Sequence, residues 1–134
     1  MFEALDIGAS GLQAQRTRMD AIAGNILNVN TTRNERGEKV PYRRRFVVLA
    51  PGEAGDASKP GVHVQEIGLD PSPPLKKYEP GHPDADADGY VSYPNIDTTI
   101  EYVNAMEASR AYEANVTMME VSKAMISSSL RIIA

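Results

Sequence analysis

The distribution of proline divides this 134-residue chain into three zones. All nine prolines lie between Pro41 and Pro94, and the segments on either side contain none. Because proline removes a helical hydrogen bond and its ring clashes with the preceding turn, a long helix is excluded from the middle zone only. We therefore expect an N-terminal helix region over 1–32, a loop-rich region with short strands over 33–95, and a C-terminal helix region over 96–134.

The N-terminal segment from Phe2 to Asn30 has a heptad pattern. Its main apolar series, with one member every seven residues, is Leu5, Leu12, Met19 and Ile26. The series three residues further on is Gly8, Gln15, Ile22 and Val29, in which only the last two are large and apolar. This spacing predicts a long helix whose apolar stripe packs against another helix.

Glycines weaken this expected helix. Gly8, Gly11 and Gly24 lie inside it, and each costs about 1 kcal/mol relative to alanine. We therefore expect the helix to need a partner surface. Small residues would let that partner approach closely, and they are Gly8, Ala9, Gly11, Ala21, Ala23 and Gly24.

The C-terminal segment from Ile96 to Ala134 contains neither glycine nor proline. Asp97 can cap a helix there, with Thr98 or Thr99 as alternatives. Two interleaved series repeat every seven residues: Ala105, Tyr112, Met119, Ile126 and Ile133, and Tyr102, Ser109, Val116, Lys123 and Leu130. A second apolar set broadens the stripe, which predicts contact with more than one neighbour; it is Val103, Met106, Met118, Val121 and Met125.

The middle zone carries three short runs that read as strands, Arg45–Leu49, Val62–Ile67 and Gly89–Tyr93. Long loops separate them. We therefore expect a mainly α fold, in which the two terminal helices pack as a coiled coil beside a small irregular β and loop region. The C-terminal helix alone would span about 55 Å at 1.5 Å per residue, which indicates an elongated molecule or a multi-chain bundle.

Candidate chemistry is sparse. His63 and His82 are the only histidines and have no nucleophile or base at a suitable spacing. The run Asp84–Gly89 (DADADG) imitates the first half of a calcium loop, but the bidentate glutamate needed at the twelfth position is Asn95. We read it as an acidic turn before a strand, and we expect no catalytic residue, no metal and no cofactor.

Charge and composition exclude further classes. The net charge of −4 argues against a nucleic-acid-binding protein. Cysteine is absent, so disulfides and thiolate metal sites are excluded. We expect neither a cleavable signal peptide nor a segment that spans lipid. The one basic cluster contains Arg43, Arg44 and Arg45. Only Tyr42 and Phe46 could add the stacking of a nucleic-acid patch, so a solvated or inter-subunit face is favoured. In the second case the cluster could meet an acidic region of a neighbouring copy and set their register. The acidic residues of the middle zone are Glu53, Asp56, Glu66, Asp70, Glu79, Asp84, Asp86 and Asp88.

Both ends of the chain resemble a known family. Ala9–Thr31 reads ASGLQAQRTRMDAIAGNILNVNT, which is similar to the N-terminal signature of the flagellar rod, hook and filament-cap-junction axial proteins. Tyr102–Met125 reads YVNAMEASRAYEANVTMMEVSKAM and, with HPDADADGYVSYPNID over His82–Asp97, resembles the C-terminal part of the proximal rod proteins of that family. The resemblance covers both ends and the junction, and residues 51–75 carry little of it.

The resemblance implies a structural subunit of the flagellar basal-body rod, not an enzyme. Terminal helices of this family (an axial D0-type domain) pair within each subunit and pack against neighbours in a helical array around an export channel. The implied partners are copies of this chain, other rod proteins and the flagellar type III export apparatus, in the periplasmic space. The expected assembly interface consists of Leu5, Leu12, Met19, Ile22, Ile26, Val29, Tyr102, Ala105, Tyr112, Val116, Met119, Ile126, Leu130 and Ile133.

Two rival functions use the same residues. A small cytoplasmic chaperone or regulator could bind partner helices through these stripes in a closed complex. A calcium-binding or hydrolytic protein would instead use the DADADG turn with His82. Copurification with basal bodies favours a rod subunit, whereas a cytosolic protein in flagellated cells favours a chaperone.

Overall fold

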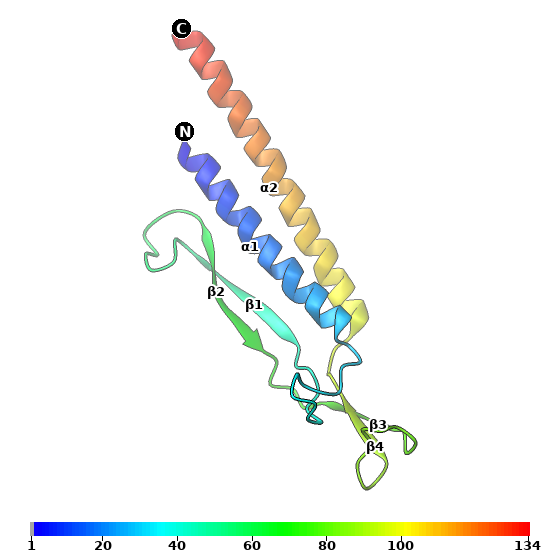
Figure 1. Cartoon of the computed structure of the whole chain (residues 1–134). Coiled ribbons are helices and arrows are strands. Elements are labelled where there is room, and N and C mark those ends of the chain that lie inside the picture. The colour runs from blue at the N-terminus through cyan, green and yellow to red at the C-terminus, as the bar shows by residue number, and fades with distance from the viewer. Residues whose placement is uncertain (1) are drawn as a thin grey trace.

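A computed structural model describes residues 2–134 (Figure 1). Met1, at which the expected N-terminal region begins, lies outside the described residues. Two long helices, α1 (Phe2–Leu27) and α2 (Thr98–Ile133), run side by side in opposite directions, so both termini lie at one end of the molecule. The intervening chain forms two small sheets.

The first sheet lies on the side of α1 that faces away from α2 (Figure 1). Strands β1 (Arg45–Pro51) and β2 (Val62–Leu69) pair antiparallel, and the register shifts between Val48 and Leu49. Both strands contact α1, whereas α2 contacts α1 alone among the helices and strands of residues 2–134. The helix α1 is therefore the middle layer of this part of the molecule.

The second sheet lies beyond the other end of the helix pair (Figure 1). It consists of β3 (Leu75–Tyr78) and β4 (Tyr90–Tyr93), which pair antiparallel. The rings of Tyr78 and Tyr90 meet edge to face at 5.3 Å between centroids. The acidic turn lies within the loop that joins these strands.

The expected fold class, a mainly α coiled coil with an irregular β and loop middle, is wrong. Helices hold 47% of the residues and strands 19%, and the strands form two regular antiparallel sheets. The three runs expected as strands are strands in the structure, but β3 was not expected. All four of its side chains are exposed, so its sequence LKKY has no alternation of apolar and polar residues that could reveal it.

The helix boundaries follow from local chemistry. The side chain of Asp97 accepts a hydrogen bond from the backbone N–H of Thr99 at 2.9 Å, so Asp97 is the N-cap of α2 as expected. At the end of α1, Asn28 Nδ2 donates to the backbone oxygen of Gly24 at 2.8 Å. The same oxygen also accepts from the backbone N–H of Asn28 at 3.1 Å, so the side chain reinforces the last helical hydrogen bond where the chain turns away.

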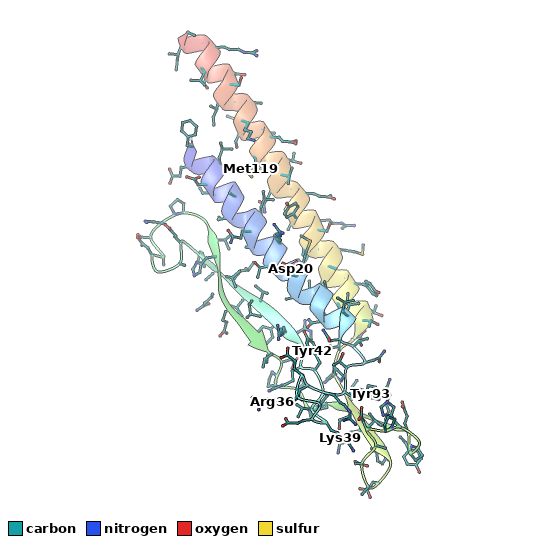
Figure 2. The ribbon with its side chains drawn as sticks, in the orientation of Figure 1. Asp20, Arg36, Lys39, Tyr42, Tyr93 and Met119 are labelled. Carbon is teal, nitrogen blue, oxygen red and sulfur yellow. The ribbon has the colours of Figure 1, made fainter. Side chains whose placement is uncertain are left out.

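Two glycines set how closely the helices approach. A Cβ added at Gly8 would lie 2.6 Å from Cγ of Met119, and one added at Gly11 would lie 2.8 Å from Nδ2 of Asn115. In Figure 2, Met119 lies between the two helices. The expected close partner of these small residues is therefore α2 of the same chain.

A buried polar network joins α1, α2 and the first sheet. Asn25 is fully buried, and Glu101 is 1% exposed. Asn25 Nδ2 donates to Glu101 Oε2 at 3.1 Å and to the backbone oxygen of Arg45 at 2.8 Å. In return, the backbone N–H of Arg45 donates to Asn25 Oδ1 at 2.9 Å. The guanidinium of Arg44 donates to Glu101 Oε1 at 2.5 Å, which compensates the buried carboxylate.

A second polar contact holds the acidic turn against the segment after α1. Thr32 Oγ1 donates to Asp84 Oδ2 at 2.5 Å, and Arg33 Nε donates to Asp84 Oδ1 at 2.5 Å. The hydrogen bond from Thr32 and the guanidinium of Arg33 lower the pKa of the Asp84 carboxyl. This acidic residue is therefore part of the fold.

Replacing Asn25 with alanine should destabilise the subunit strongly. The change leaves Glu101 and the backbone of Arg45 with buried polar atoms that have lost a partner, which costs about 3 kcal/mol. Urea unfolding followed by circular dichroism measures the difference. Asn30→Ala, at an exposed position of the same residue type, is the control and should change stability by less than about 0.5 kcal/mol. Equal stability of the two variants would contradict the structural role of Asn25.

The contact at Asp84 should make stability depend on acid pH. Because the folded pKa lies below the ordinary value of 3.8, the stabilisation is fully present above that value and is lost as the pH falls through the folded pKa. Asp84→Asn should therefore be less stable than the unchanged protein at pH 7, and the difference should shrink at pH 3. Urea titrations at both pH values test this, with Asp88→Asn, at an exposed carboxylate of the same turn, as the control. A difference that stays constant with pH would exclude the proposed contact.

Candidate assembly surface

The residues expected at an assembly interface fall into three groups by exposure. Ile22 is buried at 6% exposure between α1 and its neighbours. Tyr102, Leu130 and Ile133 are exposed, at 57%, 60% and 80%. The others are half-buried, and they are Leu5, Leu12, Met19, Ile26, Val29, Ala105, Tyr112, Val116, Met119 and Ile126.

Contacts between the helices fix their register within the subunit. Gly8 faces Met119, Gly11 faces Asn115, and Asn25 faces Glu101. The number of a residue in α1 and the number of the α2 residue opposite it therefore add to about 126. The ion pair between Arg18 and Glu107, at 3.5 Å, fits the same register.

The half-buried series lie along one open edge of the helix pair. On the opposite edge, Arg18 and Asn104 line a 170 Å³ cavity together with Phe46 of the first sheet. Helical spacing places the heptad series of both helices on the edge away from that sheet. These side chains are half covered by the partner helix, so the structure brings the two series together within one subunit while leaving part of each accessible.

The last turns of α2 extend past the start of α1. In the register found between the helices, Phe2 lies opposite a position near Ala124, so Met125 to Ile133 have no residue of α1 opposite them among the described residues. Figure 1 shows this overhang at the C-terminal end. Leu130, Ile132 and Ile133 are 60–86% exposed there.

The second apolar set expected on the C-terminal helix also remains exposed. Val103, Met106, Met118, Val121 and Met125 are 51–65% exposed. At 100° per residue they lie between about 60° and 180° around α2 from Asn115, which faces α1. Exposed apolar surfaces of this extent occur at protein–protein and membrane interaction sites and in ligand-binding grooves.

The three arginines of the basic cluster have different surroundings. Arg44 is bound within the subunit, to Glu101 at 2.5 Å and to Asp70 at 3.8 Å. Arg43 is exposed and donates to the backbone oxygen of Asp70 at 2.8 Å. Arg45 is exposed, and its guanidinium lies 5.8 Å from the ring centroid of Tyr42. Arg43 and Arg45 therefore remain accessible to a neighbour, whereas Arg44 stabilises its own subunit.

Burial perturbs the tyrosine that lies against this cluster. The hydroxyl of Tyr42 donates to Asn25 Oδ1 at 3.2 Å, and partial burial raises its pKa. Figure 2 shows Tyr42 just beyond the end of α1. The ring therefore extends the buried network of Asn25 and Glu101 towards the basic cluster.

The positions that suggested metal or catalytic chemistry have structural contacts. Asp86 Oδ1 accepts from the backbone N–H groups of Asp88 and Tyr90, each at 2.9 Å, and the bond from Tyr90 contributes most to lowering the pKa of Asp86. The backbone N–H of Asp84 donates to Nδ1 of His82 at 3.0 Å. Nδ1 of His63 lies 2.9 Å from the backbone oxygen of Gly52. Within residues 2–134, no three His, Cys, Asp or Glu side chains are grouped so that they could hold a metal ion.

Two residues that organise this surface were not expected from the sequence. Asn25 and Glu101 are polar, and the pattern of apolar residues gave no reason to bury them. One signal was available for Asn25, because it continues the spacing of Gly8, Gly11 and Ile22 along the face of α1 that meets α2. Separately, neither described helix is long and apolar enough to cross a membrane.

Comparison with known protein families matches both ends of the chain. Residues 5–33 match the family described as flagella basal body rod protein, and residues 87–132 match the C-terminal family of the flagellar basal body rod FlgEFG proteins. These are the two ends that carry the resemblance in the sequence, and the matches confirm it.

Individual relatives align over nearly the whole chain. The flagellar basal-body rod protein FlgC of Bacillus subtilis is 42% identical, over 98% of this chain and 97% of the relative. FlgC of Borreliella burgdorferi is 39% identical over 99% and 97%, and FlgC of Salmonella typhimurium is 39% identical over 90% and 89%. With this identity over almost its full length, the chain belongs to the flagellar basal-body rod protein FlgC family.

Proposed function

We propose that the chain is a structural subunit of the proximal rod of the bacterial flagellar basal body and is not an enzyme. Subunits assemble in a helical array through their terminal helices, enclose the export channel and transmit torque. Its partners are copies of itself, other rod proteins and the flagellar type III export apparatus. The rod lies in the periplasmic space, and the subunit reaches it through that apparatus without a cleavable signal peptide.

The observation that carries this proposal is the uncovered apolar surface of α2 in a member of this family. Ten large apolar side chains of that helix are 51–86% exposed, and burial of such surface in neighbours is the main force for protein association. They are Ile100, Tyr102, Val103, Met106, Met118, Val121, Met125, Leu130, Ile132 and Ile133. A subunit with this surface is incomplete until neighbours cover it.

The interface that such a rod requires is heterologous and open. A closed ring or a two-fold dimer would stop growth, whereas a head-to-tail contact that does not close generates a filament. The overhang of α2 offers exposed apolar side chains for such a contact, and Leu130, Ile132 and Ile133 are 60–86% exposed there.

Replacing Leu130 with aspartate should block rod assembly without unfolding the subunit. Leu130 is 60% exposed and lies in the overhang beyond α1, so the change introduces a charge only where a neighbour would pack. In a strain lacking the native gene, swimming halos and the amount of the chain in purified basal bodies measure the effect. Ser127→Asp, at an exposed position on the same overhang, is the control. If cells with Leu130→Asp swim normally and their basal bodies contain the variant, this end of α2 does not take part in assembly.

Reversing the charge of the two accessible arginines should impair assembly and leave folding unchanged. We expect Arg43→Glu with Arg45→Glu to leave the melting temperature near its original value and to reduce incorporation into basal bodies, because a neighbour's acidic region would then repel them. Arg44→Glu should instead destabilise the isolated subunit, since it removes the partner of buried Glu101. Thermal melts and basal-body immunoblots distinguish the two effects. Full incorporation of the double variant would remove these arginines from the interface, and a cytosolic protein in flagellated cells would favour a chaperone.

A further inference from the structure

One face of α2 carries two groups of apolar side chains that have no partner in the subunit. We call it the outer stripe; its members are Ile100, Val103, Met106, Met118, Val121, Met125 and Ile132, which are 51–86% exposed. The residues of α2 that meet α1 include Ala108 and Asn115. At 100° per residue the members of the outer stripe lie about 80–160° around the helix from Ala108, and their exposure shows that the subunit leaves them uncovered.

Charge interrupts the outer stripe at its centre. Arg110 lies between the group that ends at Met106 and the group that begins at Met118, and exposed Glu113 lies one turn further on. Among the ion pairs of residues 2–134, neither of these two side chains takes part. A partner surface that complements these charges would offer an acidic group opposite Arg110 and a basic group opposite Glu113.

The exposed face of α1 carries one basic and one acidic group, in the order that suits an antiparallel contact with α2. Arg16 and Asp20 are exposed, four residues apart, and likewise take part in no ion pair of the described residues. Exposed Ala9 and Ala23 leave room for large side chains on either side, and Leu27 is 82% exposed at the end. The half-buried edge of Leu5, Leu12, Met19 and Ile26 borders this face.

We infer that the outer stripe binds α1 of a second copy of this chain, antiparallel, with Arg110 opposite Asp20. The inference rests on the proposed function and names the partner and the register of one of its contacts. In this register facing residue numbers add to about 130, so Arg16 meets the region of Glu113. Both charge pairs are then complementary, as in specific interfaces.

The same register pairs the apolar positions along the whole contact. Leu27 lies opposite Val103, Leu12 opposite Met118, and Leu5 opposite Met125. Small Ala9 lies opposite Val121, which lets the helices approach closely. The flexible methionines adapt their shape to such a surface.

A parallel arrangement does not achieve this match. If Asp20 met Arg110 in parallel helices, Arg16 would lie against Met106 and not against Glu113. Residues Phe2 to Ile7 would extend beyond Thr98, where α2 begins, and their apolar surface would stay uncovered. Only the antiparallel register matches both charges and the length of the helices.

The register also fixes how copies are arranged. Within a subunit facing numbers add to about 126, and between copies they add to about 130. Four residues correspond to about 6 Å along a helix at 1.5 Å per residue. Neighbouring copies therefore point in the same direction and are offset along the helix axis, which produces an open helical array and not a flat ring.

Charge exchange tests the central pair. In a strain lacking the native gene, Arg110→Asp and Asp20→Arg should each reduce incorporation of the chain into purified basal bodies about tenfold, which is the change in an equilibrium constant expected from losing one such contact. The double variant should restore it. Glu120→Arg, an exposed charge on α2 outside the outer stripe, controls for charge alone. Normal incorporation of the single variants would refute the contact between Arg110 and Asp20. So would a double variant that is incorporated no more than either single variant.

Disulfide crosslinking tests the register directly, because the chain contains no cysteine. Cells carrying Ala9→Cys with Val121→Cys should give dimers and higher species on a non-reducing gel after mild oxidation. Ala9→Cys with Ala114→Cys, two turns away on the same face, is the matched control and should give at least about tenfold less, because disulfides require Cα atoms within about 7 Å. Equal crosslinking of both pairs, or none of Ala9 with Val121, would refute the register.

These results can be told apart from a failure of the proposed function. If the cysteine pairs and charge variants behave contrary to expectation while the chain is still found in basal bodies, the register is wrong and the rod function stands. If the unchanged chain is absent from basal bodies, the proposed function itself fails, and the inference fails with it.

Discussion

The side chain of Asn25 is the point at which the three parts of the subunit meet. Its amide exchanges two hydrogen bonds with the backbone of Arg45 at the start of β1, and it donates a third to Glu101 in the first turn of α2. Both the donor and the acceptor of the amide are needed, so no apolar residue can replace it. Arg44, next in the chain to Arg45, then compensates the charge of Glu101. The sheet, α1 and α2 therefore keep one arrangement, and the faces that the helices leave open are fixed by it.

Local features of the sequence were sufficient to find the helices. The absence of proline at both ends, the apolar period and the cap at Asp97 all act within a few residues, so they can be read without a structure. The sheets depend on pairing between distant segments. Strand β3 has four exposed side chains and is identified only by its partner β4, which is why a loop-rich middle was expected and the fold class was wrong.

The assembly surface could be predicted only in part for a related reason. The heptad series on both helices predicted stripes that need a partner helix, but a periodic pattern does not say whether the covering helix belongs to the same chain. Gly8 and Gly11 pack against α2 of their own subunit, although their small size would allow a helix of a neighbouring subunit to pack there equally well. The sequence suggested a contact with a neighbouring copy for Arg44 and no role for Glu101, and only their distance of 2.5 Å shows that they stabilise the interior.

The two long faces of α2 differ in chemistry because they have different tasks. The face towards α1 includes alanine, asparagine, a buried glutamate and one methionine, Met119, which pack against one fixed partner at close range. The outer stripe uses valine, isoleucine and three of the six methionines of the chain, and methionine tolerates small changes in the shape of its partner. In the proposed assembly this one helix packs within its own subunit and against a neighbouring copy. An inner face with a fixed partner and an adaptable outer stripe fit these two contacts.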